Sequence, residues 1–456
     1  MTYLYNTPDD QHAMLKAIGI ESIEELFANI PQELRLQREL DLPPKQGELE
    51  LTQHLSALAA KNLSPATHAC FLGGGSYDHF VPAAVDALAS RGEFFTSYTP
   101  YQPDVSQGNL QAMFEYQTLI CDLTGMDLSN ASLYDGGSAL AEAVIMALNT
   151  GKRGEKVVVL GTVHPEYRLI LQTYFAPLGI QIVELPCPDG VANLEQLEAA
   201  VDAETNCVVV QSPNFFGGIE DVAKIADIAH KNDAVVIQSF DPISLGILKR
   251  PGDLGADIAV AEGHSLGSPM QYGGPYLGIM ACNDKFIRRL PGRIVGQTED
   301  RRGKLCWVLT LQTREQNIRR EKATSNICTN QGLFALRASI YLALLGPGGM
   351  KQCATLCAQK AHYALNRLTE VDRLEPVFTA PFFKEFVLRD TQGNVEGLLA
   401  EAREAGFLGG VPLGQWFPDM ADCFLVCVTE KRTKHEIDAL ARTFSLIHSG
   451  GSTIHA

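Results

Sequence analysis

The sequence has no long apolar run and no excess of basic residues. No uninterrupted apolar stretch approaches the roughly 18 to 20 residues that a membrane span needs, and the first residues lack the basic and apolar regions of a secretory signal. Lys and Arg number 37 against 53 Asp and Glu, which gives a net charge of −16. Because this charge repels phosphates, we expect no nucleic acid among the partners. Since a span and a secretory signal are both missing, we expect no membrane and a cytoplasmic location.

Cysteine pairs at metal-binding spacing are also missing. The eleven cysteines include no CxxC pair and no His/Cys cluster with zinc spacing. Cys353 and Cys357 stand four residues apart, but within an apolar helical stretch. We therefore expect buried free thiols and no metal site.

The chain is predicted to contain three regions. Residues 1–65 form an N-terminal helical arm, with short helices at Asp9–Ile18 and Ser22–Ile30. In residues 66–323 short β-rich runs alternate with helical ones, which is typical of a mostly parallel sheet covered by helices on both faces. Residues 324–456 form a smaller C-terminal α+β domain. The alternating charges of Arg314 to Lys322 favour a solvated or interfacial helix.

The expected elements follow from the hydrophobic period. In the large domain the strands are Val157–Leu160, Ile180–Leu185, Cys207–Val210, Ala234–Ile237 and Ile258–Ala261, and the helices are Leu110–Leu123, Pro165–Leu178, Leu194–Val201 and Asp221–Lys231. In the small domain we expect a long helix from Leu333, a strand near Phe383–Leu388, a helix at Val395–Ala405, a strand at Cys423–Val428 and a last helix from Lys434.

Two motifs are placed where an α/β sheet binds ligands. Tyr134-Asp-Gly-Gly-Ser138 precedes an apolar helix, whose free N–H groups attract an anion such as a phosphate; alternatively Ser138 is an ordinary helix cap. Asp241 ends an apolar strand, where an aspartate pairs with the pyridine nitrogen in pyridoxal-phosphate enzymes; alternatively it caps the turn that follows.

A lysine is missing where that chemistry needs one. In such enzymes the next strand leads into a loop with the lysine that holds the cofactor, but Glu262 to Pro275 contains none, and its place falls on His264. An imidazole forms no stable imine with an aldehyde, which excludes covalent attachment of the cofactor there. His164, after another strand, could stack on a bound ring, although a structural role is more common.

A stiff loop, Tyr98 to Gly108, carries two tyrosines and two prolines. Such side chains offer contact area at low entropic cost, which favours a binding surface. A proline-stiffened connection to the next helix remains the alternative.

Five long motifs occur in the chain: Phe71-Leu-Gly-Gly-Gly-Ser-Tyr-Asp-His-Phe-Val-Pro82, the loop Tyr98 to Gly108, Ser132-Leu-Tyr-Asp-Gly-Gly-Ser-Ala-Leu-Ala-Glu-Ala143, Gly273-Gly-Pro-Tyr-Leu-Gly278 and Lys322-Ala-Thr-Ser-Asn-Ile-Cys-Thr-Asn330. Together they resemble the glycine decarboxylase family, the P-protein of the glycine cleavage system. More narrowly they resemble its subunit 1, which corresponds to the N-terminal half of the long form. The resemblance implies the pyridoxal-phosphate-dependent transferase fold, aspartate aminotransferase-like and of fold type I.

The resemblance also implies a function. It points to an α2β2 assembly in which subunit 2 holds pyridoxal phosphate, decarboxylates glycine and passes the aminomethyl group to the lipoyl arm of H-protein. Tyr98 and Tyr101 are then the expected contributors to the partner's active site, and Ser138, His164, Asp241 and His264 a vestigial cofactor pocket. The alternatives are a free-standing pyridoxamine-phosphate enzyme that uses His264 in place of lysine, and a purely structural partner.

Overall fold

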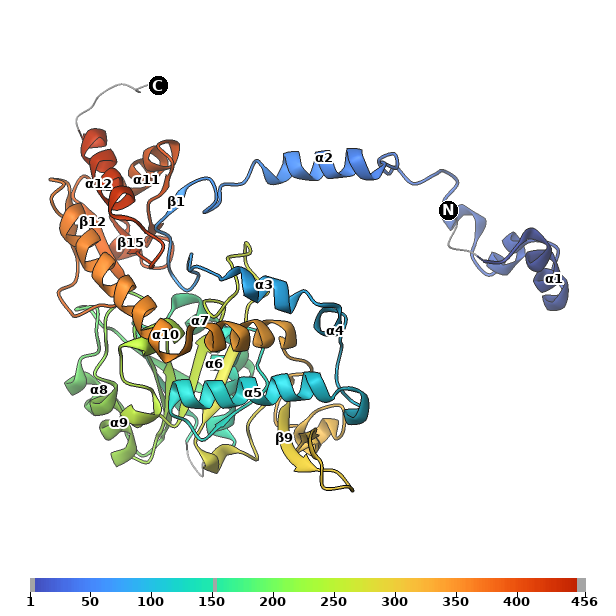
Figure 1. Cartoon of the computed structure of the whole chain (residues 1–456), viewed down its shortest axis with the longest axis horizontal. Coiled ribbons are helices and arrows are strands. Elements are labelled where there is room, and N and C mark those ends of the chain that lie inside the picture. The colour runs from blue at the N-terminus through green and yellow to red at the C-terminus, as the bar shows by residue number, and fades with distance from the viewer. Residues whose placement is uncertain (1–4, 151–153, 449–456) are drawn as a thin grey trace. The chain divides into compact units, whose positions relative to one another are not determined.

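The computed structural model describes residues 5–150 and 154–448, and the chain divides into two compact units, Met1–Leu63 and Ser64–Ala456 (Figure 1). The first unit contains α1 (Pro8–Ile18) and α2 (Glu48–Ala59). A capping box between Thr7 and Asp10 starts α1, and Gly19, in the left-handed region, ends it. Neither helix buries a side chain, so the unit has no core of its own.

A seven-stranded sheet organises the second unit, in the order β2-β8-β7-β6-β5-β3-β4. Strands β3 to β7 run parallel, and β8 and β2 are antiparallel additions at one edge. The strands are β2 (Leu128–Ser129), β3 (Lys156–Leu160), β4 (Gln181–Leu185), β5 (Thr205–Gln211), β6 (Val235–Ser239), β7 (Ile258–Glu262) and β8 (Gly278–Cys282). Nearly every residue of the central strands is buried, as expected for a sheet covered on both faces.

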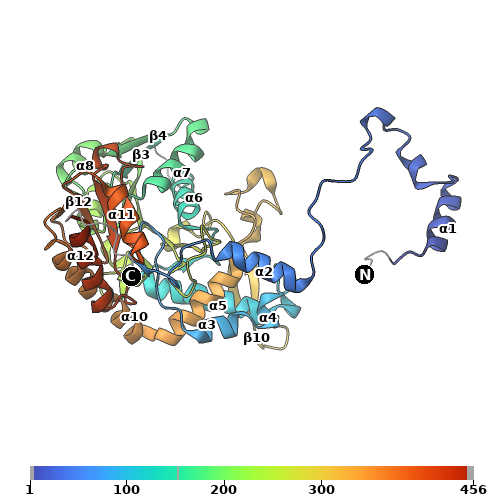
Figure 2. The ribbon, with the colours of Figure 1, turned by 90° about the horizontal axis from the view of Figure 1, so that it is seen from above.

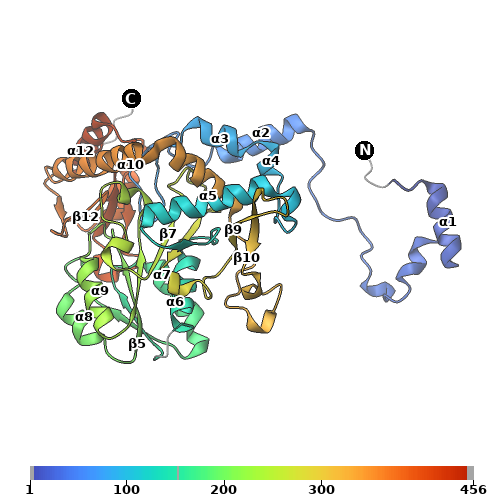
Figure 3. The ribbon, with the colours of Figure 1, turned by 60° about the horizontal axis from the view of Figure 1, so that its bottom comes forward.

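Helices cover this sheet, with α6 packed against β5 to β8 and α5 beside α10 (Figures 1 and 3). Their bounds are α3 (Ala83–Ala89), α4 (Gly92–Phe95), α5 (Gln107–Thr124), α6 (Gly136–Leu148), α7 (Pro165–Phe175), α8 (Leu194–Ala200) and α9 (Val222–Lys231). A separate antiparallel hairpin pairs β9 (Ile294–Glu299) with β10 (Leu305–Thr310).

A second core lies in the C-terminal part, where an antiparallel sheet in the order β11-β12-β15-β14 packs against helices (Figure 2). A short parallel pair, β1 with β13, brings Phe71 into the same core. The elements are β1 (Ala69–Cys70), β11 (Leu374–Pro376), β12 (Glu385–Asp390), β13 (Phe407–Leu408), β14 (Val411–Pro412), β15 (Cys423–Cys427), α11 (Val395–Glu404) and α12 (Lys434–His448).

The helix α10 (Gly332–Leu368) joins the two cores, because its buried residues contribute to both. It is broken at Gly346, whose φ of 59° is not helical, directly before Pro347. Among the described residues it is the one helix long and apolar enough to cross a membrane. Its residues instead pack against α5, α12 and the sheets, as those of a core helix do.

The fold class is confirmed, and so are, within a few residues, the strands and helices of the large domain that were predicted from the hydrophobic period. The predicted helix at Arg314 to Lys322 is wrong: two short 3-10 turns, Gln312–Arg314 and Arg320–Lys322, stand there. Arg314 is buried and its guanidinium bonds backbone carbonyls, so this part of the segment is not a solvated face. The boundaries at residues 65 and 323 stay predictions.

Candidate functional site

A small cavity lies at the carboxyl ends of the central strands, where open α/β sheets bind ligands. Gln211 ends β5, Asp241 follows β6 and Glu262 ends β7, and all three line the cavity. Lys384, directly before β12, closes it from the C-terminal part. The remaining volume is about 30 Å³, far below the several hundred Å³ of typical ligand pockets.

A buried ion pair lines this cavity. The Asp241 Oδ2 atom lies 2.6 Å from Nζ of Lys384, whose side chain is 1% exposed. The other oxygen of Asp241 accepts a hydrogen bond from the N–H of Ile243 at 2.9 Å. Asp241 is therefore both a turn cap and a charged partner. Burial opposes the charge of Lys384, but the Asp241 carboxylate outweighs it and raises the pKa of the amine above its usual range.

Hydrogen bonds continue from this lysine into the C-terminal part. Nζ of Lys384 donates to Nε2 of His79 at 2.9 Å and lies 3.4 Å from the centre of the Tyr77 ring. Nδ1 of His79 donates to Glu430 at 2.6 Å, and the N–H of Phe80 donates to the same carboxylate. Each charged group in this buried series thus has a partner, as burial requires.

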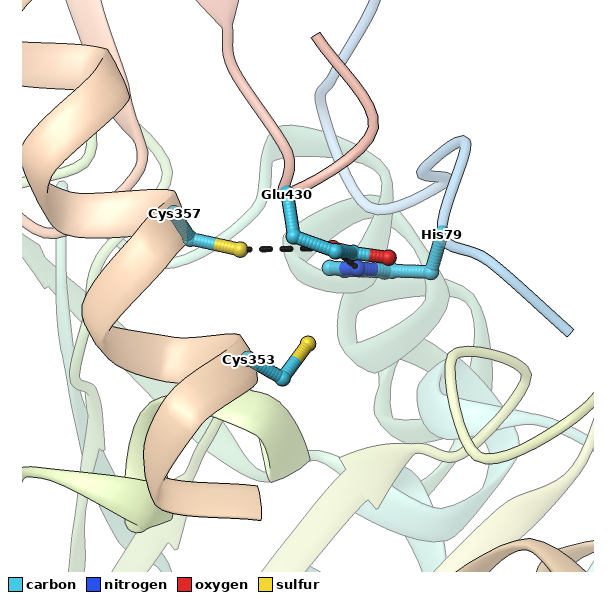
Figure 4. A group of neighbouring side chains, drawn as sticks. All are labelled: His79, Cys353, Cys357 and Glu430. Atoms are coloured by element: carbon cyan, nitrogen blue, oxygen red, sulfur yellow. Dashed lines mark hydrogen bonds and ion pairs between the residues drawn. The ribbon is translucent and has the colours of Figure 1, made fainter. Parts of the chain in front are cut away.

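Four potential metal ligands meet at the end of this series (Figure 4). One ligand atom from each of His79, Cys353, Cys357 and Glu430 lies within 4.8 Å of the others. Both ring nitrogens of His79 already have hydrogen-bond partners, and one of those partners is an ammonium group. Because a metal-bound imidazole must donate its other N–H, a lysine cation at that nitrogen opposes metal binding. The absence of a metal stays a prediction.

The start of α6 is occupied by the chain's own carboxylates. Asp135 caps the helix by accepting from the N–H of Ser138 at 2.7 Å, so Ser138 is not the cap. Glu262 accepts from the N–H groups of Gly136, Leu277 and His264 at 2.9 to 3.1 Å. Burial raises the pKa of Glu262 to about 7. The carboxylates of Asp135 and Glu262 therefore occupy the start of α6, where the sequence predicts a bound anion.

His164 has a structural role. It caps α7 by accepting from the N–H of Glu166 at 3.2 Å, and its Nε2 donates to the carbonyl of Gly74. Its ring stacks on Tyr167 at 4.7 Å and meets the edge of Phe215. These contacts favour the structural role over stacking on a bound ring.

The side chain of His264 is also fixed by contacts within the chain. Its Nε2 accepts from the N–H of Tyr77 at 3.1 Å, and its ring stacks on Tyr276 at 4.6 Å. Complete burial lowers the pKa of the imidazole to about 3. Of the four residues predicted to form the vestigial pocket, only His164 and Asp241 line the cavity, whereas Ser138 and His264 do not.

Tyr98 and Tyr101 lie on an exposed loop apart from this cavity, with 87% and 56% of their surface accessible. Arg293 anchors the loop by donating to the hydroxyl of Thr99 at 3.1 Å, and its guanidinium carbon lies 6.0 Å from the centre of the Tyr101 ring. Exposed tyrosines on a fixed loop suit contact with another molecule.

Sequence reasoning missed Lys384, Glu385, Glu262 and Tyr77. Glu385 accepts from the N–H of Gly74 at 2.7 Å and from the hydroxyl of Tyr77 at 3.0 Å. A signal was available, because a Lys-Glu pair that opens an otherwise apolar strand buries two charges and needs partners.

Pyridoxal phosphate does not fit this cavity. The aspartate that would face its pyridine nitrogen is paired with Lys384, and the helix start that would take its phosphate holds Glu262. A Cβ on Gly136 would lie 2.4 Å from the Tyr167 hydroxyl and 2.8 Å from the backbone of Glu262, so this corner has no free space. The protonated amine of Lys384 is also a poor nucleophile.

Comparisons with known proteins agree with the fold and its motifs. The family model described as glycine cleavage system P-protein matches residues 1–444. The chain is 50% identical over 447 residues to glycine dehydrogenase (decarboxylating) subunit 1 from Desulforamulus reducens, covering 98% of this chain and 100% of that one. A relative of the same name from Carboxydothermus hydrogenoformans is 50% identical over 440 residues, covering 96% of this chain and 98% of that one.

Solved structures support the same relationship. A crystal structure of glycine decarboxylase (P-protein) of the glycine cleavage system, in inhibitor-bound form, matches with a TM-score of 0.89 and 44% identity, covering 98% of this chain and all of that one. A sphingosine-1-phosphate lyase from Burkholderia pseudomallei matches with a TM-score of 0.67 and 14% identity, covering 92% and 94% of the two chains, which shows the fold alone. The chain belongs to the glycine cleavage system P-protein family.

Proposed function

We propose that this chain is the subunit of glycine decarboxylase that does not hold the cofactor. Its relatives are named as subunit 1 of glycine dehydrogenase (decarboxylating), an oxidoreductase, and they match over nearly their whole length. The supporting observation is the ion pair of Lys384 with Asp241, because this aspartate would otherwise face the ring nitrogen of the cofactor. A second subunit in an α2β2 assembly then binds pyridoxal phosphate, which supplies the electron sink for decarboxylation of glycine.

In this proposal the chain contributes a surface. Tyr98 and Tyr101 lie at the mouth of the partner's active site, where their hydroxyl groups position glycine or the lipoyl arm of H-protein. The exposure of both side chains and the anchoring of the loop by Arg293 support this role, because a fixed loop positions a group more precisely than a mobile one. The assembly is proposed to act in the cytoplasm.

The test is reconstitution with the second subunit. Each subunit alone should show no glycine–bicarbonate exchange, and the mixture should restore it. Pyridoxal phosphate should be recovered with the second subunit only. Exchange by this chain alone would contradict the proposal.

The role of the loop is tested by Tyr98→Phe and Tyr101→Phe. At least one variant should slow the exchange of the reconstituted enzyme while both still assemble with the partner, as measured by gel filtration. Tyr5→Phe, at another exposed tyrosine, is the matched control and should leave the rate unchanged. Normal rates with both loop variants would instead support a purely structural partner.

The geometry disfavours a free-standing enzyme that uses His264. This imidazole is 1% exposed, accepts a hydrogen bond from a backbone N–H and does not line the cavity. A general base must reach the proton that it removes. A cofactor absorption band in the purified chain would restore this alternative.

A further inference from the structure

A larger pocket lies where α4, α5 and the first half of α10 meet. Its volume is about 150 Å³, five times that of the cavity at Asp241. We call it the α5–α10 pocket. It is lined by Phe94, Phe95, Ser97, Tyr98, Thr99, Asn109, Ala112, Met113, Arg293, Thr329, Asn330, Gly332, Leu333, Ala335 and Leu336.

Arg293 is the one charged side chain among these residues. It is 4% exposed and forms no ion pair with any described residue, although Glu315 lies close enough to feel its charge. Its guanidinium donates to Asn330 at 2.8 Å, to Thr99 and to the carbonyl of Cys328, and its Nε has no partner. The Glu315 carboxylate acts on this cation only from beyond ion-pair distance, so an anion bound directly beside the guanidinium would be favoured.

The start of α10 provides a second, independent feature. Gln331, at the cap position, forms no capping hydrogen bond with its side chain. In the part of the chain that the structure describes, the N–H groups of Gly332, Leu333 and Phe334 have no acceptor. Free N–H groups and the helix dipole favour a negative charge at this end.

Much of the pocket lining is apolar. Phe94, Phe95, Met113 and Leu336 are among the lining residues. An inorganic anion alone would leave these side chains without contacts, whereas an anion with a short apolar portion would cover them.

We propose that the α5–α10 pocket binds a small oxyanion, a carboxylate or phosphate group on a short apolar body, through Arg293 and the start of α10. Since Tyr98 lines the same pocket, bound anion would lie at the base of the exposed loop. The inference does not depend on the proposed function, because the chain by itself contains all these groups.

Calorimetric titration of the full chain with butyrate and with inorganic phosphate, at constant ionic strength in chloride, tests this proposal. At least one of the two should bind saturably with one site per chain. Stronger binding of butyrate would assign a carboxylate on an apolar body, and stronger binding of phosphate would assign a phosphate group. Arg293→Gln should weaken the binding at least about tenfold, because charge-assisted hydrogen bonds are lost.

Ala112→Leu is a second variant, which fills the pocket from α5 and leaves Arg293 in place; it too should weaken binding. The matched control is Arg319→Gln, at an exposed arginine outside the pocket, and should bind like the unchanged chain. Absence of saturable binding of both anions, or equal binding by the unchanged chain and Ala112→Leu, would overturn the proposal.

Discussion

Lys384 is one of the residues that distinguish this cavity from a cofactor site. Lys384 places a positive charge beside Asp241, where the protonated ring nitrogen of pyridoxal phosphate would stand in a related enzyme. The carboxylate therefore keeps a cationic partner without the cofactor. The surrounding groups, His79 and Glu430, extend the same charge compensation into the C-terminal part.

Removal of this lysine should destabilise the fold strongly. Lys384→Met leaves the Asp241 carboxylate buried without its cationic partner, which costs about 3 to 5 kcal/mol. The double variant Lys384→Met/Asp241→Asn should recover most of the loss, because no charge is left and the asparagine still caps Ile243. Urea unfolding of the three proteins measures the differences. A double variant as unstable as the single one would show that the charge pair is not the cause.

The acid Glu142 should make stability depend on pH. It is 2% exposed in α6, and burial raises its pKa to about 7. Because the pKa of Glu142 is higher in the folded than in the unfolded chain, folding favours the protonated form. Its contribution to stability is therefore fully present below about pH 4.5 and is lost as the pH rises through about 7. From pH 5 to pH 8 the free energy of unfolding of Glu142→Gln should therefore rise by about 1 to 3 kcal/mol relative to that of the unchanged chain. The free energy of unfolding at both pH values checks this, and a constant difference would contradict it.

The residues of the cavity could be predicted only in part. Asp241 and the missing lysine of the following loop were identifiable, because strand ends and loop composition are local features. Lys384 was not, because it approaches Asp241 from a different sheet, and no local pattern fixes that approach. The sequence offered Ser138 as an anion-binding residue or as the cap of α6, but Asp135 is the cap and accepts the hydrogen bond from the N–H of Ser138 at 2.7 Å.

At the scale of elements, α10 links the two cores through a break. Gly346 has φ 59° and ψ −177°, a conformation that side chains with a Cβ resist. The break lets one helix follow α5 with its first half and pack in the second core with its last turns.

Gly346→Ala should destabilise the protein by about 1 to 3 kcal/mol, because of backbone strain alone. A Cβ at this position meets no atom within 4 Å, so a clash cannot explain the loss. Gly348→Ala is the matched control, since its surroundings are equally open and its φ is not positive. This variant should be neutral or slightly stabilising. Thermal unfolding compares the two, and equal effects would contradict the strain argument.

The main strands were predictable from sequence because they are buried on both faces and read as continuous apolar runs. The β9–β10 hairpin was not predicted. Residues 297–299 of β9 are exposed, so half of this strand leaves no apolar pattern to recognise.

At the scale of the whole molecule, the chain has the fold of a pyridoxal-phosphate enzyme around a cavity that its own side chains fill. The sheet, the edge at which ligands bind and the aspartate are all present. In this cavity Asp241 pairs with Lys384 and not with a cofactor, so the chemistry is proposed to depend on a second subunit. The loop at Tyr98 and Tyr101 and the α5–α10 pocket lie outside that cavity.

The central claim, that this cavity holds Lys384 instead of a cofactor, is tested most directly by borohydride trapping. The chain is incubated with pyridoxal phosphate, reduced and digested, and the peptides are analysed by mass spectrometry. We predict that the peptide containing Lys384 carries no pyridoxyl group, while exposed lysines such as Lys224 react slowly. A stoichiometric pyridoxyl adduct at Lys384 would contradict the account.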